Sequence, residues 1–263
     1  DNFVTALQVD ASGAIWVGTL NGLNRFDPKQ GRFDSIKLTA AKSADRDVVL
    51  SLHLDATQQL WVGTNNGLVL LQTNQQTVSR LVSGEQLTAV VQNSSISAIS
   101  ASADGTLWLG TPRGLVHFDP ASNRLNLVQD FPVTAGAIMS LHHDSAGRLW
   151  VGLEQDGLLM RQPDSARWTQ LPISSYTTGI SNNEIRSIIS TSANEVWVGS
   201  ERGLLKLQLT EGQWQQQENY QHQRHNPASL GSGKVVSLLQ DHDGSIWVGT
   251  WNGGVSRLNQ ANN

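Results

Sequence analysis

Glu154, Glu184 and Glu201 are the glutamates of this sequence that could supply a catalytic carboxylate pair. Two carboxyl groups that flank a glycosidic bond can hydrolyse it by acid–base catalysis. Nothing in the spacing of the three residues requires such a pair. The sequence also lacks a Gly-x-Ser-x-Gly elbow, a phosphate-binding loop and a His-Glu-x-x-His motif. We therefore predict no catalytic residues in this segment, and an enzyme is the alternative hypothesis.

Histidines are the other side chains with chemical capacity. His142 and His143 are adjacent, and neighbours on a strand point to opposite faces, so they cannot both bind one ion. His222 and His225 flank Arg224, whose positive charge disfavours a cation. We predict no metal site. His142 is instead expected to be a hydrogen-bonded polar residue near an inner strand, as is His53 at the equivalent repeat position.

The composition excludes several classes of function. The 263 residues include no cysteine, which removes disulfides, thiolate metal sites and cysteine nucleophiles. Eighteen basic residues against 22 acidic ones give a net charge of −4, without the basic block that nucleic-acid binding requires. No apolar run approaches the roughly 18 residues of a membrane span. We expect no cofactor, no nucleic acid, and membrane attachment only through parts outside this segment.

A repeat organises the whole chain. A phrase built on Trp-Val-Gly-Thr recurs at successive spacings of 45, 47, 42, 47 and 50 residues. This period is typical of the four-stranded blade of a β-propeller. The six tryptophans, predicted to fill the core between blades, are Trp16, Trp61, Trp108, Trp150, Trp197 and Trp247.

Turn residues stand at fixed places around each tryptophan. Six positions before it lies Asp, Ser or Thr, which can accept backbone hydrogen bonds, and three before it lies Gly or Asn, which tolerates positive φ. Gln58 is the exception and should cost stability locally. A second glycine after each tryptophan, as in Asn21-Gly22, marks another hairpin. Each copy therefore predicts a meander of antiparallel strands.

The predicted fold class is all-β, a propeller of four-stranded antiparallel blades with six repeats. The last copy stops after its third strand, so the last blade is incomplete. A fragment of a seven-bladed parent and a six-bladed ring closed without a full last blade both stay open. We predict a single propeller domain or propeller fragment over 1–263, with repeats at about 3–38, 48–82, 95–129, 137–172, 184–218 and 234–259.

Candidate binding residues lie on the rim shared by the second-to-third turns and the connections between blades. Loops that vary on a constant scaffold are where recognition normally occurs. Trp251 is the only aromatic residue at its repeat position, which suits either a stacking platform for a sugar or packing against a neighbouring domain. The charged residues would form a mixed-charge mouth for a polar neutral ligand or a protein loop, or else simply be solvated. The full predicted set is Arg113, Glu154, Glu184, Arg186, Glu201, Arg202, Lys234 and Trp251.

The consensus of the copies is V-x-[AS]-L-x-x-D-x-x-G-x-[IL]-W-[VL]-G-T-x-x-G-L, followed by phrases such as Arg25-Phe26-Asp27-Pro28. This pattern resembles the two-component regulator propeller repeat over essentially the whole chain. The resemblance implies a larger bacterial receptor with periplasmic sensor propellers, a membrane segment and a cytoplasmic histidine kinase or diguanylate cyclase output. In sugar-responsive relatives the sensor region recognises oligosaccharides.

From this resemblance we expect a non-enzymatic, periplasmic ligand-binding propeller of a signalling receptor. The expected partners are a small molecule or oligosaccharide and neighbouring domains of the same receptor, with a homodimer of the parent also open. A propeller lyase or glycosidase and a pure assembly scaffold are the alternative functions.

Overall fold

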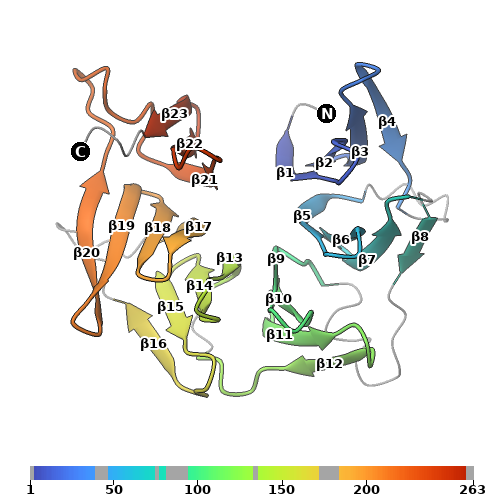
Figure 1. The fold of residues 1–263 in the computed structure, drawn as a ribbon, viewed down its shortest axis with the longest axis horizontal. Coiled ribbons are helices and arrows are strands. Elements are labelled where there is room, and N and C mark those ends of the chain that lie inside the picture. The colour runs from blue at the N-terminus through green and yellow to red at the C-terminus, as the bar shows by residue number, and fades with distance from the viewer. Residues whose placement is uncertain are drawn as a thin grey trace. The chain divides into compact units, whose positions relative to one another are not determined.

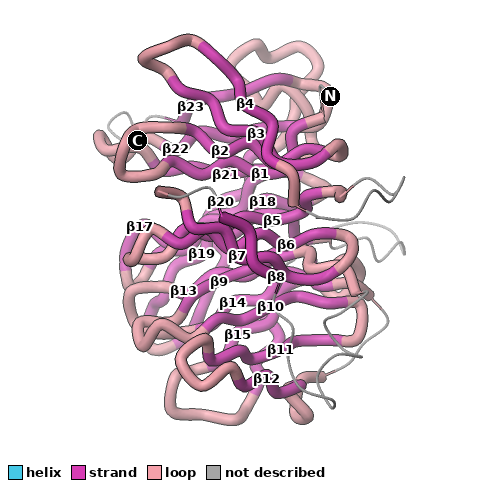
Figure 2. Tube along the Cα trace, turned by 90° about the vertical axis from the view of Figure 1, so that its right-hand side faces the viewer, coloured by secondary structure: helices cyan, strands magenta, loops and turns pink. Residues whose placement is uncertain are grey.

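The computed structural model describes residues 3–38, 47–74, 77–80, 94–132, 136–171 and 184–258. Every regular element in these residues is a strand, and Figure 2 shows strands and loops alone. No helix in the described residues is long and apolar enough to cross a membrane. The chain divides into two compact units, 1–129 and 130–263, each of which contains three small antiparallel sheets.

The first unit contains blades A, B and C, each a four-stranded meander in which consecutive strands pair (Figure 1). Blade A consists of β1 (Val4–Val9), β2 (Ile15–Thr19), β3 (Gly22–Asp27) and β4 (Arg32–Ile36). Blade B consists of β5 (Val49–Leu54), β6 (Gln59–Thr64), β7 (Gly67–Gln72) and β8 (Thr77–Arg80). Blade C consists of β9 (Ala98–Ala101), β10 (Leu107–Thr111), β11 (Gly114–Asp119) and β12 (Arg124–Leu127).

The second unit contains blades D, E and F. Blade D consists of β13 (Ile138–His143), β14 (Leu149–Leu153), β15 (Leu158–Arg161) and β16 (Trp168–Leu171). Blade E consists of β17 (Ile185–Ser192), β18 (Glu195–Ser200), β19 (Gly203–Thr210) and β20 (Gln213–Tyr220). Blade F has three strands, β21 (Val235–Gln240), β22 (Ile246–Thr250) and β23 (Gly254–Leu258). The predicted all-β propeller fold is confirmed, and among the described residues the sixth blade has three strands.

The glycine of the Trp-Val-Gly-Thr phrase lets neighbouring blades approach closely. A Cβ atom on Gly63 would lie 2.2 Å from Ser51 Oγ and 2.6 Å from the Ile96 carbonyl oxygen. Ser51 Oγ itself donates to that carbonyl at 3.0 Å, which ties β5 of blade B to the start of blade C. The small residue and the glycine of the repeat are therefore both requirements of blade-to-blade packing.

The tryptophans of the first two blades of each unit pack on the blade that follows them. Trp16 lies in a core with Val49 and Val62 of blade B, and Trp150 lies in a core with Ile185 and Val198 of blade E. Four of the six are buried, namely Trp16, Trp61, Trp150 and Trp197.

The prediction that all six tryptophans are core residues is wrong for Trp247, which is 37% exposed, and Trp108 is half-buried. Both belong to the third blade of their unit, which has no following blade within that unit to cover them.

Gln58 has the backbone conformation that its place in the turn requires. Its φ is 63°, whereas glycine occupies the equivalent left-handed position at Gly13 with φ 83°. A residue with a Cβ atom pays a steric cost in this region. The predicted local cost at this turn therefore has a visible geometric cause.

Candidate functional site

A backbone hydrogen bond that recurs in blades A, B, D, E and F places the rim residues of these blades in pairs. The residue just after the second strand donates its N–H to the carbonyl of the residue just before the first strand. In blade E, Glu201 donates to Glu184 at 3.1 Å, and in blade F, Trp251 donates to Lys234 at 2.8 Å. In blade B the same positions hold Asn65 and Val48, bonded at 3.0 Å. At these positions blades E and F carry charged and aromatic side chains, whereas both residues of blade B are uncharged.

Lys234 connects the two pairs. Its Nζ lies 2.7 Å from Glu201 Oε2 and 3.3 Å from Glu184 Oε2, so one ammonium of blade F contacts two carboxyl groups of blade E. Arg186 forms a further ion pair with Glu184. We call Glu184, Arg186, Glu201, Lys234 and Trp251 the rim cluster. Five of the eight residues that the sequence predicted are brought together here.

A β-bulge directs Arg186 toward this cluster. The pairing of β17 with β18 shifts between Ile185 and Ser187, which leaves Arg186 as the extra residue of the strand. Bulges re-aim side chains and are common beside functional sites. Blades A, B, D and F have the same register shift, and their residues at the bulge are Thr5, Leu50, Met139 and Val236. Only blade E places a charge there.

Trp251 is the exposed edge of the cluster. Its side chain is 44% exposed, and Lys234 Nζ lies 5.7 Å from its ring centroid. The turn that carries it is anchored by a close backbone approach, because a Cβ on Gly231 would lie 2.1 Å from the Gly253 carbonyl oxygen. An aromatic face held beside hydrogen-bonding groups suits a ligand with one apolar face and several polar groups.

The pKa values of the two glutamates are shifted in opposite directions. Burial and a hydrogen bond with Glu201 raise the pKa of Glu184, against the opposing effect of Arg186 and Lys234. Burial alone would also raise the pKa of Glu201, but its hydrogen bonds with Lys234 and Glu184 lower it. The pair therefore combines a carboxyl that holds its proton more strongly with a carboxylate that releases it more easily.

The remaining predicted residues lie elsewhere or have local partners. The Arg202 N–H donates to Ser200 Oγ at 3.2 Å in the turn beside Glu201. The Glu154 carboxylate accepts from the Ala137 N–H at 3.4 Å within blade D. Arg113 is exposed in blade C of the other unit, where its N–H donates to Thr111 Oγ1 at 3.2 Å. Four variable connections between blades were predicted to contribute to recognition. The connection 220–233 is described, whereas 39–47, 83–94 and 174–183 lie wholly or mostly outside the described residues.

Sequence reasoning did not anticipate a cavity of about 220 Å³ at the outer part of blades E and F. Its lining includes Tyr220 and Leu230 from the connection and Ser256 and Leu258 from β23.

His142 and His222 are hydrogen-bonded structural residues. His142 Nε2 lies 2.8 Å from Ser190 Oγ and accepts the Ser190 N–H at 3.1 Å, which links blade D to blade E. His222 Nδ1 lies 2.6 Å from the Leu230 carbonyl oxygen. Across the described residues, no group of three or more histidine, aspartate or glutamate side chains is arranged to hold a metal ion.

The expected resemblance is confirmed by comparison with known proteins. The family model for the two component regulator propeller matches residues 1–21 and 229–252, which contain the Trp-Val-Gly-Thr phrases of blades A and F. No curated protein sequence matches the chain.

Solved structures share the propeller fold. The extracellular domain of a putative hybrid two component system from B. thetaiotaomicron matches with a TM-score of 0.58 and 16% identity, over 99% of this chain and 40% of that one. A catalytically inactive virginiamycin B lyase from Staphylococcus aureus with quinupristin matches with a TM-score of 0.71 and 13% identity, over 99% and 82%. PorZ, a surface component of the type-IX secretion system of Porphyromonas gingivalis, matches with a TM-score of 0.70 and 16% identity, over 99% and 40%. The chain thus spans about 40% of the length of the two-component relative.

Proposed function

We propose that this chain, which carries two component regulator propeller repeats, is an extracytoplasmic ligand-binding segment of a bacterial signalling receptor. The rim cluster of blades E and F is its recognition site, and the segment itself carries out no chemistry. The proposal is supported by the family match at two repeats and by the likeness in fold to extracellular domains of two-component systems.

The observation that carries the proposal is the convergence of charge and aromatic surface at one pair of blades. The cluster contains two acidic and two basic side chains, so its formal charge is balanced, which favours a polar uncharged ligand over a polyanion. Trp251 supplies a face for stacking, Lys234 lies beside it as a donor, and Glu201, which is paired with Lys234, is the acceptor. A sugar ring has the matching combination of an apolar face and several hydroxyl groups.

Signalling would follow from the position of Lys234 between two blades. A ligand hydroxyl that bonds Glu201 competes with the ion pair from Lys234 to Glu201. The contact between blade F and blade E would then be rearranged, and with it the surface that the segment presents to neighbouring domains. A ligand can shift such an equilibrium only by the difference in its affinity for the two arrangements.

A thermal-shift screen of this chain against mono- and oligosaccharides, amino acids and common metabolites tests the proposal. A ligand at about 100 times its Kd stabilises the folded state by about 2.7 kcal/mol. We expect Glu201→Gln and Trp251→Ala each to abolish or strongly reduce the shift. Arg32→Gln, which removes an exposed ion pair to Asp34 in the other unit, is the control and should leave the shift unchanged. A blank screen on folded protein would instead favour an assembly scaffold.

A lyase or glycosidase is the second candidate, because the pKa of Glu184 is raised and the pKa of the neighbouring Glu201 is lowered, the combination that a general acid and a general base use. The likeness in fold to virginiamycin B lyase supports this alternative hypothesis. Incubation with quinupristin and with a glycan panel, followed by mass spectrometry, would detect turnover. Product formation that Glu184→Gln abolishes would replace the non-enzymatic proposal.

A further inference from the structure

Lys234 of the rim cluster places its ammonium among groups that recognise cations. Its Nζ lies 2.7 Å from Glu201 Oε2 and 3.3 Å from Glu184 Oε2. The same nitrogen lies 5.7 Å from the ring centroid of Trp251. Carboxylates that pair with a cation and an aromatic ring that faces it are the groups by which proteins bind a ligand ammonium. The chain therefore fills an ammonium position with a side chain of its own.

The groups around this position are held by the backbone, whereas the ammonium is carried on a long side chain. The backbone hydrogen bond of blade E joins Glu201 to Glu184 at 3.1 Å, and that of blade F joins Trp251 to Lys234 at 2.8 Å. The Lys234 side chain is 25% exposed, and a flexible carbon chain connects its ammonium to the backbone. The ammonium can therefore turn out to solvent while the backbone that carries the carboxyl groups and the indole stays in place.

The repeat does not require a cation at the position of Lys234. The residue whose carbonyl accepts the same backbone hydrogen bond is Phe3 in blade A, Val48 in blade B and Ala137 in blade D. The bond forms in these blades without a charge on the accepting residue. Lys234 is therefore explained by the carboxyl groups that it contacts in blade E, and not by the folding of its own blade.

The charge of the cluster determines which ligand can displace Lys234. Glu201 Oε2 is buried, and the Lys234 ammonium compensates its charge. A ligand hydroxyl alone would leave this carboxylate without a cation, which is costly for a buried charge. Arg186 is paired with Glu184, so displacement of Lys234 leaves one net negative charge in the cluster. A polar ligand with one ammonium group restores the balance.

Lys206 of blade E shows which feature separates a ligand position from an internal contact. Its Nζ lies 3.3 Å from Glu195 Oε2 and 3.7 Å from Glu218 Oε1. The same nitrogen lies 5.4 Å from the ring centroid of Trp197, which is only 1% exposed. Trp251 is 44% exposed, so a ligand can stack on it while its ammonium reaches the carboxyl groups.

We propose that the rim cluster binds an amino sugar through its primary ammonium group, which takes the place of the Lys234 ammonium between Glu201 and Glu184. The proposal rests on the recognition role proposed for the rim cluster and names the chemical class of its ligand. The sugar ring stacks on Trp251, and the displaced Lys234 side chain turns to solvent. The ion pair that joins blade F to blade E is thereby exchanged for a contact with the ligand.

Chemical rescue of Lys234→Ala tests the ammonium position directly, with n-propylammonium chloride as the probe. We expect the Tm of the variant to rise saturably with n-propylammonium, because the added cation replaces the lost one. Neither 1-propanol nor sodium chloride at the same concentration should give a saturable rise, and Glu201→Gln in the same chain should remove the response. Lys234→Met takes the place of Lys234→Ala if the latter does not fold. A folded variant without a saturable rise would overturn the proposal.

Isothermal titration with glucosamine and N-acetylglucosamine separates this proposal from the proposed function. Acetylation removes the ammonium, so the wild type should bind glucosamine at least about tenfold more tightly. Lys234→Met should increase this ratio because the internal competitor is gone, whereas Lys206→Met should keep the wild-type ratio. Equal affinities for the two sugars, both lost in Trp251→Ala, would leave the recognition role intact and overturn the ammonium proposal.

Discussion

The indole Nε1 of Trp150 donates to Asp144 Oδ2 at 2.7 Å, six residues earlier in the chain. The same hydrogen bond joins Trp16 to Asp10 at 2.9 Å and Trp61 to Asp55 at 3.0 Å. In each case the other carboxylate oxygen accepts backbone N–H groups of the turn, as Asp10 Oδ1 does from Ser12 at 2.8 Å. One aspartate therefore closes the hairpin and also satisfies the only polar atom of the core tryptophan.

Removing this aspartate should destabilise the fold. Asp10→Ala leaves the Trp16 N–H buried and the turn without its acceptor, at a cost of about 1–3 kcal/mol. Urea unfolding of the variant and the wild type measures the difference. Asp34→Ala is the control because Asp34 makes an exposed ion pair with Arg32, and it should cost well under about 1 kcal/mol. Equal losses in the two variants would show that the hydrogen bond to Trp16 contributes nothing.

The close contact between blades predicts a large effect at Gly63. Gly63→Ala places a methyl group 2.2 Å from Ser51 Oγ and 2.6 Å from the Ile96 carbonyl oxygen, so the two blades must separate. Overpacking of this kind costs about 1–3 kcal/mol or more. Gly233→Ala is a matched control, since nothing lies within 4 Å of its added Cβ. Thermal unfolding of both should show a clear loss for the first variant alone. An unchanged midpoint for Gly63→Ala would contradict the described packing of blade B on blade C.

His142 predicts a dependence of stability on pH. Burial lowers the pKa of His142, with Asp144 opposing the shift, and its Nε2 accepts the Ser190 N–H and is therefore unprotonated. Because the unfolded chain binds a proton near the ordinary histidine pKa of about 6.5, this contribution to stability is present above that pH. It is lost as the pH falls from there toward the lower pKa of the folded state.

The free energy of unfolding should therefore fall more steeply between about pH 7.5 and 5.5 in the wild type than in His142→Gln. His225→Gln, at an exposed position, should keep the wild-type slope. Parallel slopes for the wild type and His142→Gln would mean that the histidine is not held neutral by the fold.

Local chemistry explains why so much of the fold could be predicted from sequence. The turns at Asp10 and Gly13 and the hairpin at Asn21-Gly22 each depend on residues within a few positions. The repeat register then placed Glu184, Glu201, Lys234 and Trp251 on one rim, because the same backbone hydrogen bond forms at the equivalent positions of blades E and F. Ion-pair partners on neighbouring blades follow from that register.

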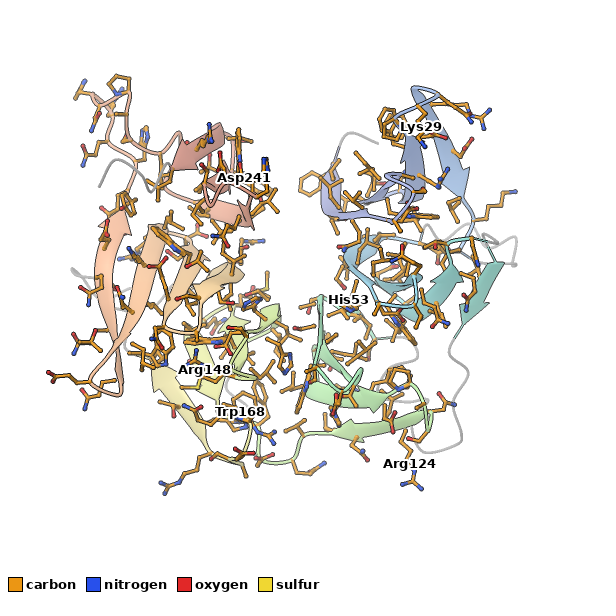
Figure 3. All side chains as sticks on the ribbon, in the orientation of Figure 1. Lys29, His53, Arg124, Arg148, Trp168 and Asp241 are labelled. Atoms are coloured by element: carbon orange, nitrogen blue, oxygen red, sulfur yellow. The ribbon has the colours of Figure 1, made fainter. Side chains whose placement is uncertain are left out.

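Contacts at positions where one blade departs from the repeat consensus could not be predicted. In blade E the turn position holds Thr191, and the Trp197 indole instead donates to Glu195 Oε1 at 2.9 Å. Arg148, which is labelled in Figure 3, is 4% exposed, although a charged residue at a turn is ordinarily solvated. Its Nε lies 2.6 Å from Asp144 Oδ2, which compensates the burial of its charge. Its guanidinium also lies 4.8 Å from the ring centroid of Trp214, a residue of the next blade. No pattern in the sequence near Arg148 predicts that Trp214 is its partner.

The tryptophans of blades A and F show how a neighbouring blade changes the stability contribution of a residue in an identical local sequence. Both lie in the pentapeptide Ile-Trp-Val-Gly-Thr, and both donate to an aspartate six residues earlier, Trp247 to Asp241 at 2.7 Å. Trp16 is fully buried against blade B, whereas Trp247 is 37% exposed. We expect Trp16→Ala to cost about 3–5 kcal/mol, as for a core aromatic residue. Trp247→Ala should cost about 1–2 kcal/mol, because less apolar area leaves water when this side chain folds. Chemical unfolding of both variants measures the difference, and since the local sequences are the same, it reports the neighbouring blade alone. Equal losses would show that another surface covers Trp247 in solution.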